Sequence, residues 1–112
     1  PVEITVTWSN AAKDLDIFLI EGDLDLDGAL LDDSQGVTTT EQVVLSADEE
    51  GVFSLYMYEW SSDYPVEYDI SFTFPGGRVE TFTDAKIQDD SFQFTLIKAS
   101  LGAQFGYRIT QL

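Results

Sequence analysis

The sequence predicts an all-β fold: an antiparallel β-sandwich, jelly-roll or immunoglobulin-like, of eight or nine short strands in a single domain spanning residues 1–112. Three observations predict it. Apolar and polar side chains alternate with a period of two in run after run, and helical periodicity is almost absent. Turn-forming residues separate the runs, which leaves no room for the crossover helices of a parallel sheet. Hydrophobic residues make up 44% of the chain, enough for a packed core.

The N-terminal half supplies four expected strands, at residues 2–8, 15–21, 41–47 and 52–60. The first (VEITVTW) alternates cleanly, as a strand with one buried face does. The second (LDIFLIE) carries apolar side chains on both faces, so we expect its second face to be partly covered. The third (EQVVLSA) is followed by the turn DEEG. In the fourth, Phe53, Leu55 and Met57 are expected to face inward. A short helical turn is expected only around residues 9–13.

The C-terminal half supplies four more expected strands, at residues 66–74, 78–83, 91–97 and 105–112. The first of these (VEYDISFTF) alternates Tyr68, Ile70 and Phe72 with polar side chains, and PGG after it is a strong turn signal. The last three are rich in β-branched and aromatic residues, which favour strands. The stretches DAKIQDD and KASLGA are expected to connect them.

Composition excludes several classes of function. The chain has 21 carboxylates against five basic residues, a net charge of −16, so nucleic acids and anionic membranes should be repelled. It has no histidine and no cysteine, which removes the commonest general base and thiolate chemistry. A glycosidase needs only two carboxylates, but a domain this small leaves little room for a deep cleft. We expect no enzyme activity, and no apolar run is long enough for membrane insertion.

The stretch EGDLDLDGALLDDS raises the question of a calcium loop. Asp23, Asp25 and Asp27 stand at every second position before Gly28, as in the first half of an EF-hand loop. Position 12 of such a loop would be Ser34 instead of glutamate, and no helices flank it, which argues against a true EF-hand. Two interpretations stay open: a calcium loop of another kind, or a solvated acidic strand and turn.

Charge crowding favours a bound cation. Eight carboxylates lie between residues 14 and 33 with only Lys13 nearby: Asp14, Asp16, Glu21, Asp23, Asp25, Asp27, Asp32 and Asp33. We predict a Ca²⁺ site with five ligands, Asp14, Asp16, Asp23, Asp25 and Asp27. Ca²⁺ is favoured over Mg²⁺ because Mg²⁺ demands a stricter coordination geometry. Two alternatives remain. Asp14 can cap the preceding turn, and acidic residues elsewhere in the chain fit a surface adapted to high salt.

Aromatic residues supply a candidate binding surface. If Phe53, Leu55 and Met57 face inward, Tyr56, Tyr58 and Trp60 face outward along the same strand, and Tyr64 follows in the loop. Exposed aromatic side chains stack on sugar rings or anchor protein partners. The alternative is that residues 91–112 cover this face.

Part of the chain resembles a known family. VEITVTWSNAAKDLDIFLIE resembles the opening of secreted bacterial domains of the pre-peptidase C-terminal (PPC) type: a strand ending in tryptophan, a polar loop, and then Asp-Leu-Asp and an apolar run. GALLDDS, EQVVLSADEEGVFSLYMYEW and VEYDISFTF resemble the segments that follow. The resemblance covers roughly residues 2–74. GDLDLD looks like an insertion, and residues 75–112 extend beyond the usual domain.

The resemblance implies a non-catalytic β-sandwich that accompanies exported proteins, with Asp14 and Asp16 at motif positions near the calcium of collagen-binding members. We therefore expect an accessory or adhesion module of a bacterial surface or secreted protein, with the acidic cluster as the place where calcium would stabilise it. It would be secreted, periplasmic or at the cell surface, with any targeting signal upstream of Pro1. The partner would be a polysaccharide or a surface protein. The alternatives are a carbohydrate-binding module using Tyr56, Tyr58 and Trp60, and a purely structural spacer.

Overall fold

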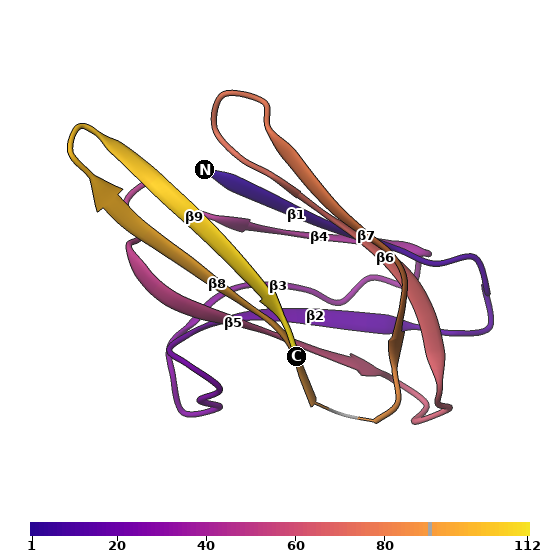
Figure 1. Cartoon of the computed structure of the whole chain (residues 1–112). Coiled ribbons are helices and arrows are strands. Elements are labelled where there is room, and N and C mark those ends of the chain that lie inside the picture. Colours follow the sequence, from indigo (N-terminus) through magenta and orange to yellow (C-terminus); the bar gives the residue numbers. More distant parts are fainter. Residues whose placement is uncertain (90) are drawn as a thin grey trace.

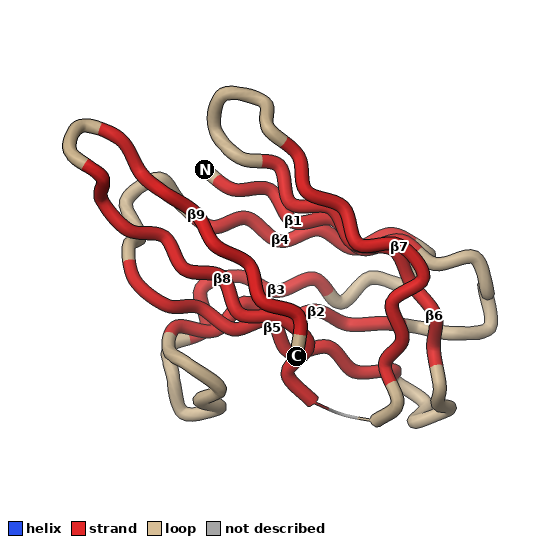
Figure 2. The backbone as a smooth tube through the Cα atoms, viewed as in Figure 1, coloured by secondary structure: helices blue, strands red, loops and turns tan. Residues whose placement is uncertain are grey.

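The computed structural model describes residues 1–89 and 91–112 and confirms the antiparallel β-sandwich (Figure 1). Figure 2 shows strands joined by loops and turns, with no helix in the described part of the chain. No described residue therefore belongs to a helix that could cross a bilayer. The strands are β1 (Val2–Thr7), β2 (Leu15–Glu21), β3 (Leu30–Ser34), β4 (Thr40–Leu45), β5 (Gly51–Glu59), β6 (Val66–Thr73), β7 (Val79–Ile87), β8 (Ser91–Leu101) and β9 (Gln104–Gln111).

The strands form two sheets. The four-stranded sheet has the order β4-β1-β6-β7, and the five-stranded sheet has the order β3-β2-β5-β8-β9. Neighbouring strands pair antiparallel throughout both sheets. The chain crosses between the sheets after β1, β3, β4, β5 and β7, so residues distant in sequence meet along the edges.

The core lies between the two inner faces, as the alternation predicts. Phe53, Leu55 and Met57 of β5 are buried, which confirms their expected direction. Phe72 of β6 packs edge-on against Phe94 of β8, with ring centroids 5.6 Å apart, and joins the sheets through an aromatic contact. Burial of such side chains is the main stabilising contribution to a fold of this kind.

Four local expectations were wrong. Residues 30–34 form β3, which none of the eight predicted strands included. Strand β7 continues through DAKI to Ile87, and β8 continues to Leu101, because these segments pair with β6 and β9 where connections were expected. Residues 9–13 form a turn instead of a helical turn, closed by a hydrogen bond from the Lys13 N–H to the Asn10 carbonyl at 3.0 Å.

One side of the sandwich is closed by contacts between edge strands of the two sheets. The backbone N–H of Val44 in β4 donates to Asp32 Oδ2 in β3 at 2.7 Å. Two residues further along β3, the Ser34 hydroxyl hydrogen-bonds to Glu41 Oε2 of β4. Side chains of β3 thus bind the edge of the opposite sheet, and Glu41 is held at this junction.

Candidate metal centre

Three carboxylates converge where β2 begins and β4 begins. Asp14 precedes β2, Asp16 lies in it, and Glu41 belongs to β4 in the other sheet. One carboxylate oxygen from each lies within 4.8 Å of the other two. Backbone contacts fix Asp14: its N–H donates to Glu59 Oε1 at 3.1 Å, and its carbonyl accepts the Trp60 N–H at 2.8 Å.

Two of these carboxylates are buried, the third is half-buried, and all three are incompletely satisfied. Asp16 is 3% exposed and Glu41 is 4% exposed. One oxygen on each of the three residues, Asp14 Oδ1, Asp16 Oδ1 and Glu41 Oε1, is inaccessible to solvent and has no hydrogen-bond partner. Buried polar atoms in folded proteins nearly always have a partner, so these three oxygens distinguish the cluster from ordinary buried carboxylates.

Electrostatics gives the same indication. Burial, followed by the charges of Asp14, Glu41, Asp33 and Glu59, raises the pKa of Asp16 to about 6. At a separation of 4.8 Å and an effective dielectric constant of about 20, two like unit charges repel by roughly 3.5 kcal/mol. A bound cation would offset this repulsion.

The donor set fits calcium. Ca²⁺ prefers hard oxygen ligands, with Ca–O distances of about 2.3–2.6 Å. Two ligand oxygens on opposite sides of the ion therefore stand about 4.8 Å apart. Three carboxylates would leave coordination positions for carbonyl oxygens or water. Gly36 also lies close to the Glu41 carboxylate, since a Cβ on Gly36 would stand 3.3 Å from Glu41 Oε1. A larger residue at this position would crowd the orphaned oxygen.

A neighbouring buried carboxylate shows the contrasting arrangement. Glu59 is fully buried, yet its oxygens accept the Asp63 N–H at 2.7 Å, the Ser61 hydroxyl at 2.8 and 2.7 Å, and the Asp14 N–H. Burial acts to raise the pKa of Glu59, but these hydrogen bonds outweigh burial and lower it. Glu59 is therefore a satisfied structural carboxylate, unlike its neighbours at the candidate site.

The structure divides the five residues predicted as metal ligands. Asp14 and Asp16 meet Glu41, whereas Asp23, Asp25 and Asp27 lie in the exposed β2–β3 loop, at the other end of β2 (Figure 1). Among the described residues, no cluster of three or more carboxylates at metal-ligand spacing includes Asp23, Asp25 or Asp27. Asp25 Oδ1 instead accepts the Asp27 N–H at 2.9 Å, as in a turn. Cation binding by the loop stays a prediction.

Sequence reasoning missed Glu41, although a signal was present. In the alternating strand EQVVL, Glu41 shares the buried face of Val43 and Leu45. A carboxylate on a buried face is rare unless it is paired or binds a metal. The alternative role of Asp14 was to cap the preceding turn. No N–H group donates to Asp14 Oδ1, so this oxygen gives that role no support.

The predicted aromatic surface is partly rearranged. Tyr56 and Tyr58 lie half-buried on the outer face of the five-stranded sheet, where the Phe18 ring lies 6.0 and 6.3 Å from theirs. Trp60 is 67% exposed but follows β5 in a turn. Tyr64 packs against the core, and its hydroxyl accepts the Glu59 N–H at 2.9 Å. Tyr64 therefore has a structural role.

The alternative that residues 91–112 cover this face is wrong. Strands β8 and β9 extend the same sheet sideways from β5, so they cannot lie over it. Instead β8 adds Phe92 beside Tyr56, with ring centroids 5.6 Å apart. Binding of a glycan to these aromatic residues stays a prediction.

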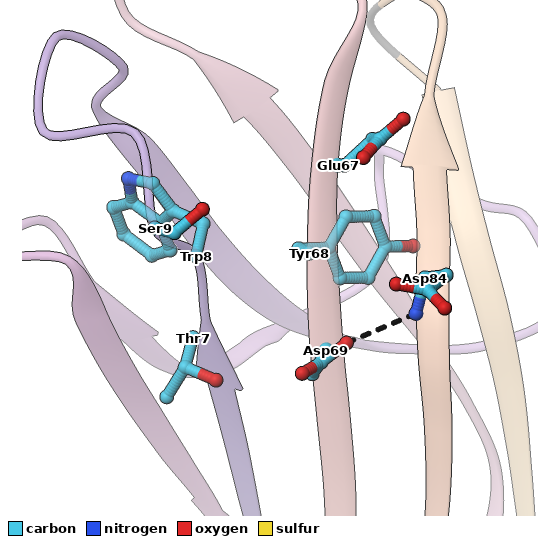
Figure 3. A pocket seen from close by; sticks show the side chains of 7 residues that line it. All are labelled: Thr7, Trp8, Ser9, Glu67, Tyr68, Asp69 and Asp84. Carbon is cyan, nitrogen blue, oxygen red and sulfur yellow. Dashed lines mark hydrogen bonds between the residues drawn. The ribbon is translucent and has the colours of Figure 1, made fainter.

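A separate cavity of about 310 Å³ opens at the end of β1, between that strand and β6 (Figure 3). Its lining comprises Thr7, Trp8, Ser9, Glu67, Tyr68, Asp69 and Asp84. Figure 3 shows Asp69 turned toward Asp84, whose N–H donates to Asp69 Oδ1 at 2.9 Å. Glu67 forms an ion pair with Lys86 at 3.8 Å. Among the described residues, no group of three carboxylates at metal-ligand spacing lines this cavity, so it is not a comparable metal centre.

No family model, no curated protein and no solved structure matches this chain.

Proposed function

We propose that this chain is a non-catalytic β-sandwich module of a secreted or cell-surface protein, stabilised by a calcium ion held between its sheets. In this proposal Asp14, Asp16 and Glu41 form a calcium clasp, a name used below for these three residues. The observation that carries the proposal is that three carboxylates with oxygens within 4.8 Å of one another each also hold a buried oxygen that has no hydrogen-bond partner.

The position of the clasp explains why a cation would matter to an accessory module. Asp16 belongs to the five-stranded sheet and Glu41 to the four-stranded sheet, so one ion would tie the sheets together at their closed edge. Extracellular fluids contain millimolar calcium, and sites of moderate affinity suffice there. The absence of histidine and cysteine from the sequence favours a scaffold or adhesion role over catalysis.

Thermal unfolding after removal of bound metal tests the proposal. Millimolar calcium chloride should raise Tm by about 10 °C or more relative to sodium chloride of equal ionic strength, because a ligand at a hundred times its Kd adds about 2.7 kcal/mol. Asp16→Asn and Glu41→Gln should each remove most of that rise.

The paired variant Asp25→Asn with Asp27→Asn is the matched control. It removes the same kind of charge from the exposed loop and should keep the full calcium response. Equal Tm values in the calcium and sodium salts would refute the clasp. A response lost only in the loop variant would move the ion to the β2–β3 loop.

A further inference from the structure

A small apolar groove lies on the outer face of the five-stranded sheet, beside the β2–β3 loop. Its volume is about 260 Å³, and it is lined by Phe18, Ile20, Leu26, Gly28, Leu30 and Tyr56. It is distinct from the calcium clasp, because the loop that forms one wall leaves β2 at the end away from Asp14 and Asp16 (Figure 1).

The loop wall is fixed in place. The Ser54 hydroxyl accepts the Leu24 N–H at 2.9 Å and donates to the Gly22 carbonyl at 2.8 Å, so it binds the loop to the outer face of β5. Gly28 approaches β2 so closely that a Cβ would lie 1.8 Å from the Glu21 carbonyl oxygen. The groove is thus formed before any partner arrives, which lowers the entropy cost of binding.

Leucine side chains border the groove in contact with solvent. Leu26 is 64% exposed, Leu30 is 54% exposed, and Leu24 in the same loop is 50% exposed. Single exposed leucines are ordinary, but several together around an apolar hollow are typical of an interaction surface.

Uncompensated negative charge lies along the chain segments that supply the groove's lining. The exposed carboxylates nearest in the chain are Glu21, Asp23, Asp25, Asp27 and Asp33. The chain has no lysine or arginine from residue 14 to residue 77. Ion pairs within the described part of the chain are Lys13–Asp63, Arg78–Glu80 and Lys86–Glu67, none of which involves this rim.

We propose that this groove docks a basic amphipathic segment of a partner protein, with an apolar side chain between Leu26 and Leu30 and lysines or arginines against the acidic rim. Charge complementarity selects this occupant. A second copy of the chain would bring a net charge of −16 toward the same rim. A neutral glycan would gain nothing from the rim charge, and the groove walls are aliphatic on the loop side.

Titration of the isotope-labelled protein with an acetylated Lys-Leu-Lys-Phe-Lys peptide, in calcium-containing buffer, tests the proposal. Amide shifts in nuclear magnetic resonance spectra should concentrate at Leu26, Gly28 and Leu30, and binding should weaken as sodium chloride is added. Leu26→Ser with Leu30→Ser should weaken binding about tenfold or more. Asp25→Asn with Asp27→Asn should weaken it about three- to tenfold, while asparagine can still accept the turn hydrogen bond.

The matched control is Asp48→Asn with Asp89→Asn, which removes two exposed charges elsewhere and should leave the affinity unchanged. Three outcomes would overturn the proposal: equal binding of a peptide with glutamate in place of lysine, shifts spread over the whole acidic surface, or groove shifts with a neutral oligosaccharide but none with the peptide. The calcium dependence of Tm is measured separately, so failure here leaves the clasp untouched.

Discussion

Asp16 and Glu41 belong to opposite sheets, yet each places a buried carboxylate oxygen within 4.8 Å of the other. Neither orphaned oxygen accepts a hydrogen bond. Glu59, equally buried nearby, is satisfied by hydrogen-bond donors from its own turn and from Asp14. The contrast separates a carboxylate whose oxygens are satisfied from a pair with unpartnered oxygens, which is why we propose a counter-ion there.

Replacement of Asp16 by asparagine should stabilise the metal-free protein. The change removes one of three facing charges, and the new amide can donate to the remaining carboxylates. At neutral pH the free energy of unfolding should rise by roughly 1–3 kcal/mol, since one pKa unit corresponds to about 1.4 kcal/mol. Urea denaturation in a chelator measures it, and a clear loss of stability would contradict the assigned repulsion.

The stability of the metal-free protein should depend on pH through Asp16. Its pKa rises from 3.8 to about 6 on folding, owing to burial and then to Asp14, Glu41, Asp33 and Glu59. In that window the folded state binds more protons than the unfolded chain, so stability falls as pH rises from about 4 to 6 and then levels. The difference between wild type and Asp16→Asn isolates this contribution, and a flat difference curve would contradict it.

Glu59→Gln should destabilise the protein with or without calcium. Glutamine cannot accept all the donors that converge on Glu59, and a hydrogen bond to a charged group contributes about 1.5–3 kcal/mol. We expect a loss of about 2–3 kcal/mol in denaturant unfolding. Because the pKa of Glu59 is lowered, its contribution is present above the unfolded value of 4.5 and lost as pH falls through the folded value.

The control for that variant is Glu67→Gln, which removes an exposed carboxylate whose ion pair with Lys86 is long. Exposed pairs contribute between about 0 and 1 kcal/mol, so little change is expected. If both variants lost the same stability, the turn at residues 59–63 would not depend on the buried carboxylate.

Asp32→Ala should loosen the closed edge of the sandwich. It removes the acceptor of the Val44 N–H, and a net loss of about 1 kcal/mol is expected. Asp32→Asn keeps an acceptor oxygen and should retain most of the stability. Hydrogen exchange of the Val44 amide measures this contact directly, and we expect faster exchange in the alanine variant only. Unchanged exchange would mean that the edge is protected by other contacts.

The strand pattern was predictable because alternation is a local property of the chain. The inward direction of Phe53, Leu55 and Met57 followed from it, and so did the exclusion of helices. Strand β3 was not predicted, since LLDDS does not alternate cleanly and forms only by pairing with β2. Its irregular register, with a shift between Leu19 and Ile20, has no sequence signature.

The candidate site was half predictable. Asp14 and Asp16 stood out, but their partner comes from β4, and a contact between sheets cannot be read from spacing along one strand. Grouping them with Asp23, Asp25 and Asp27 treated closeness in sequence as closeness in space. A seven-residue strand separates the two sets by about 20 Å, since each residue adds about 3.3 Å.

A crystal structure grown with calcium, with anomalous scattering to identify the ion, tests the central claim most directly. The expected result is one calcium peak about 2.4 Å from oxygens of Asp14, Asp16 and Glu41. If instead these carboxylates stood apart around water, or the only peak lay at Asp23, Asp25 and Asp27, the calcium clasp would be wrong.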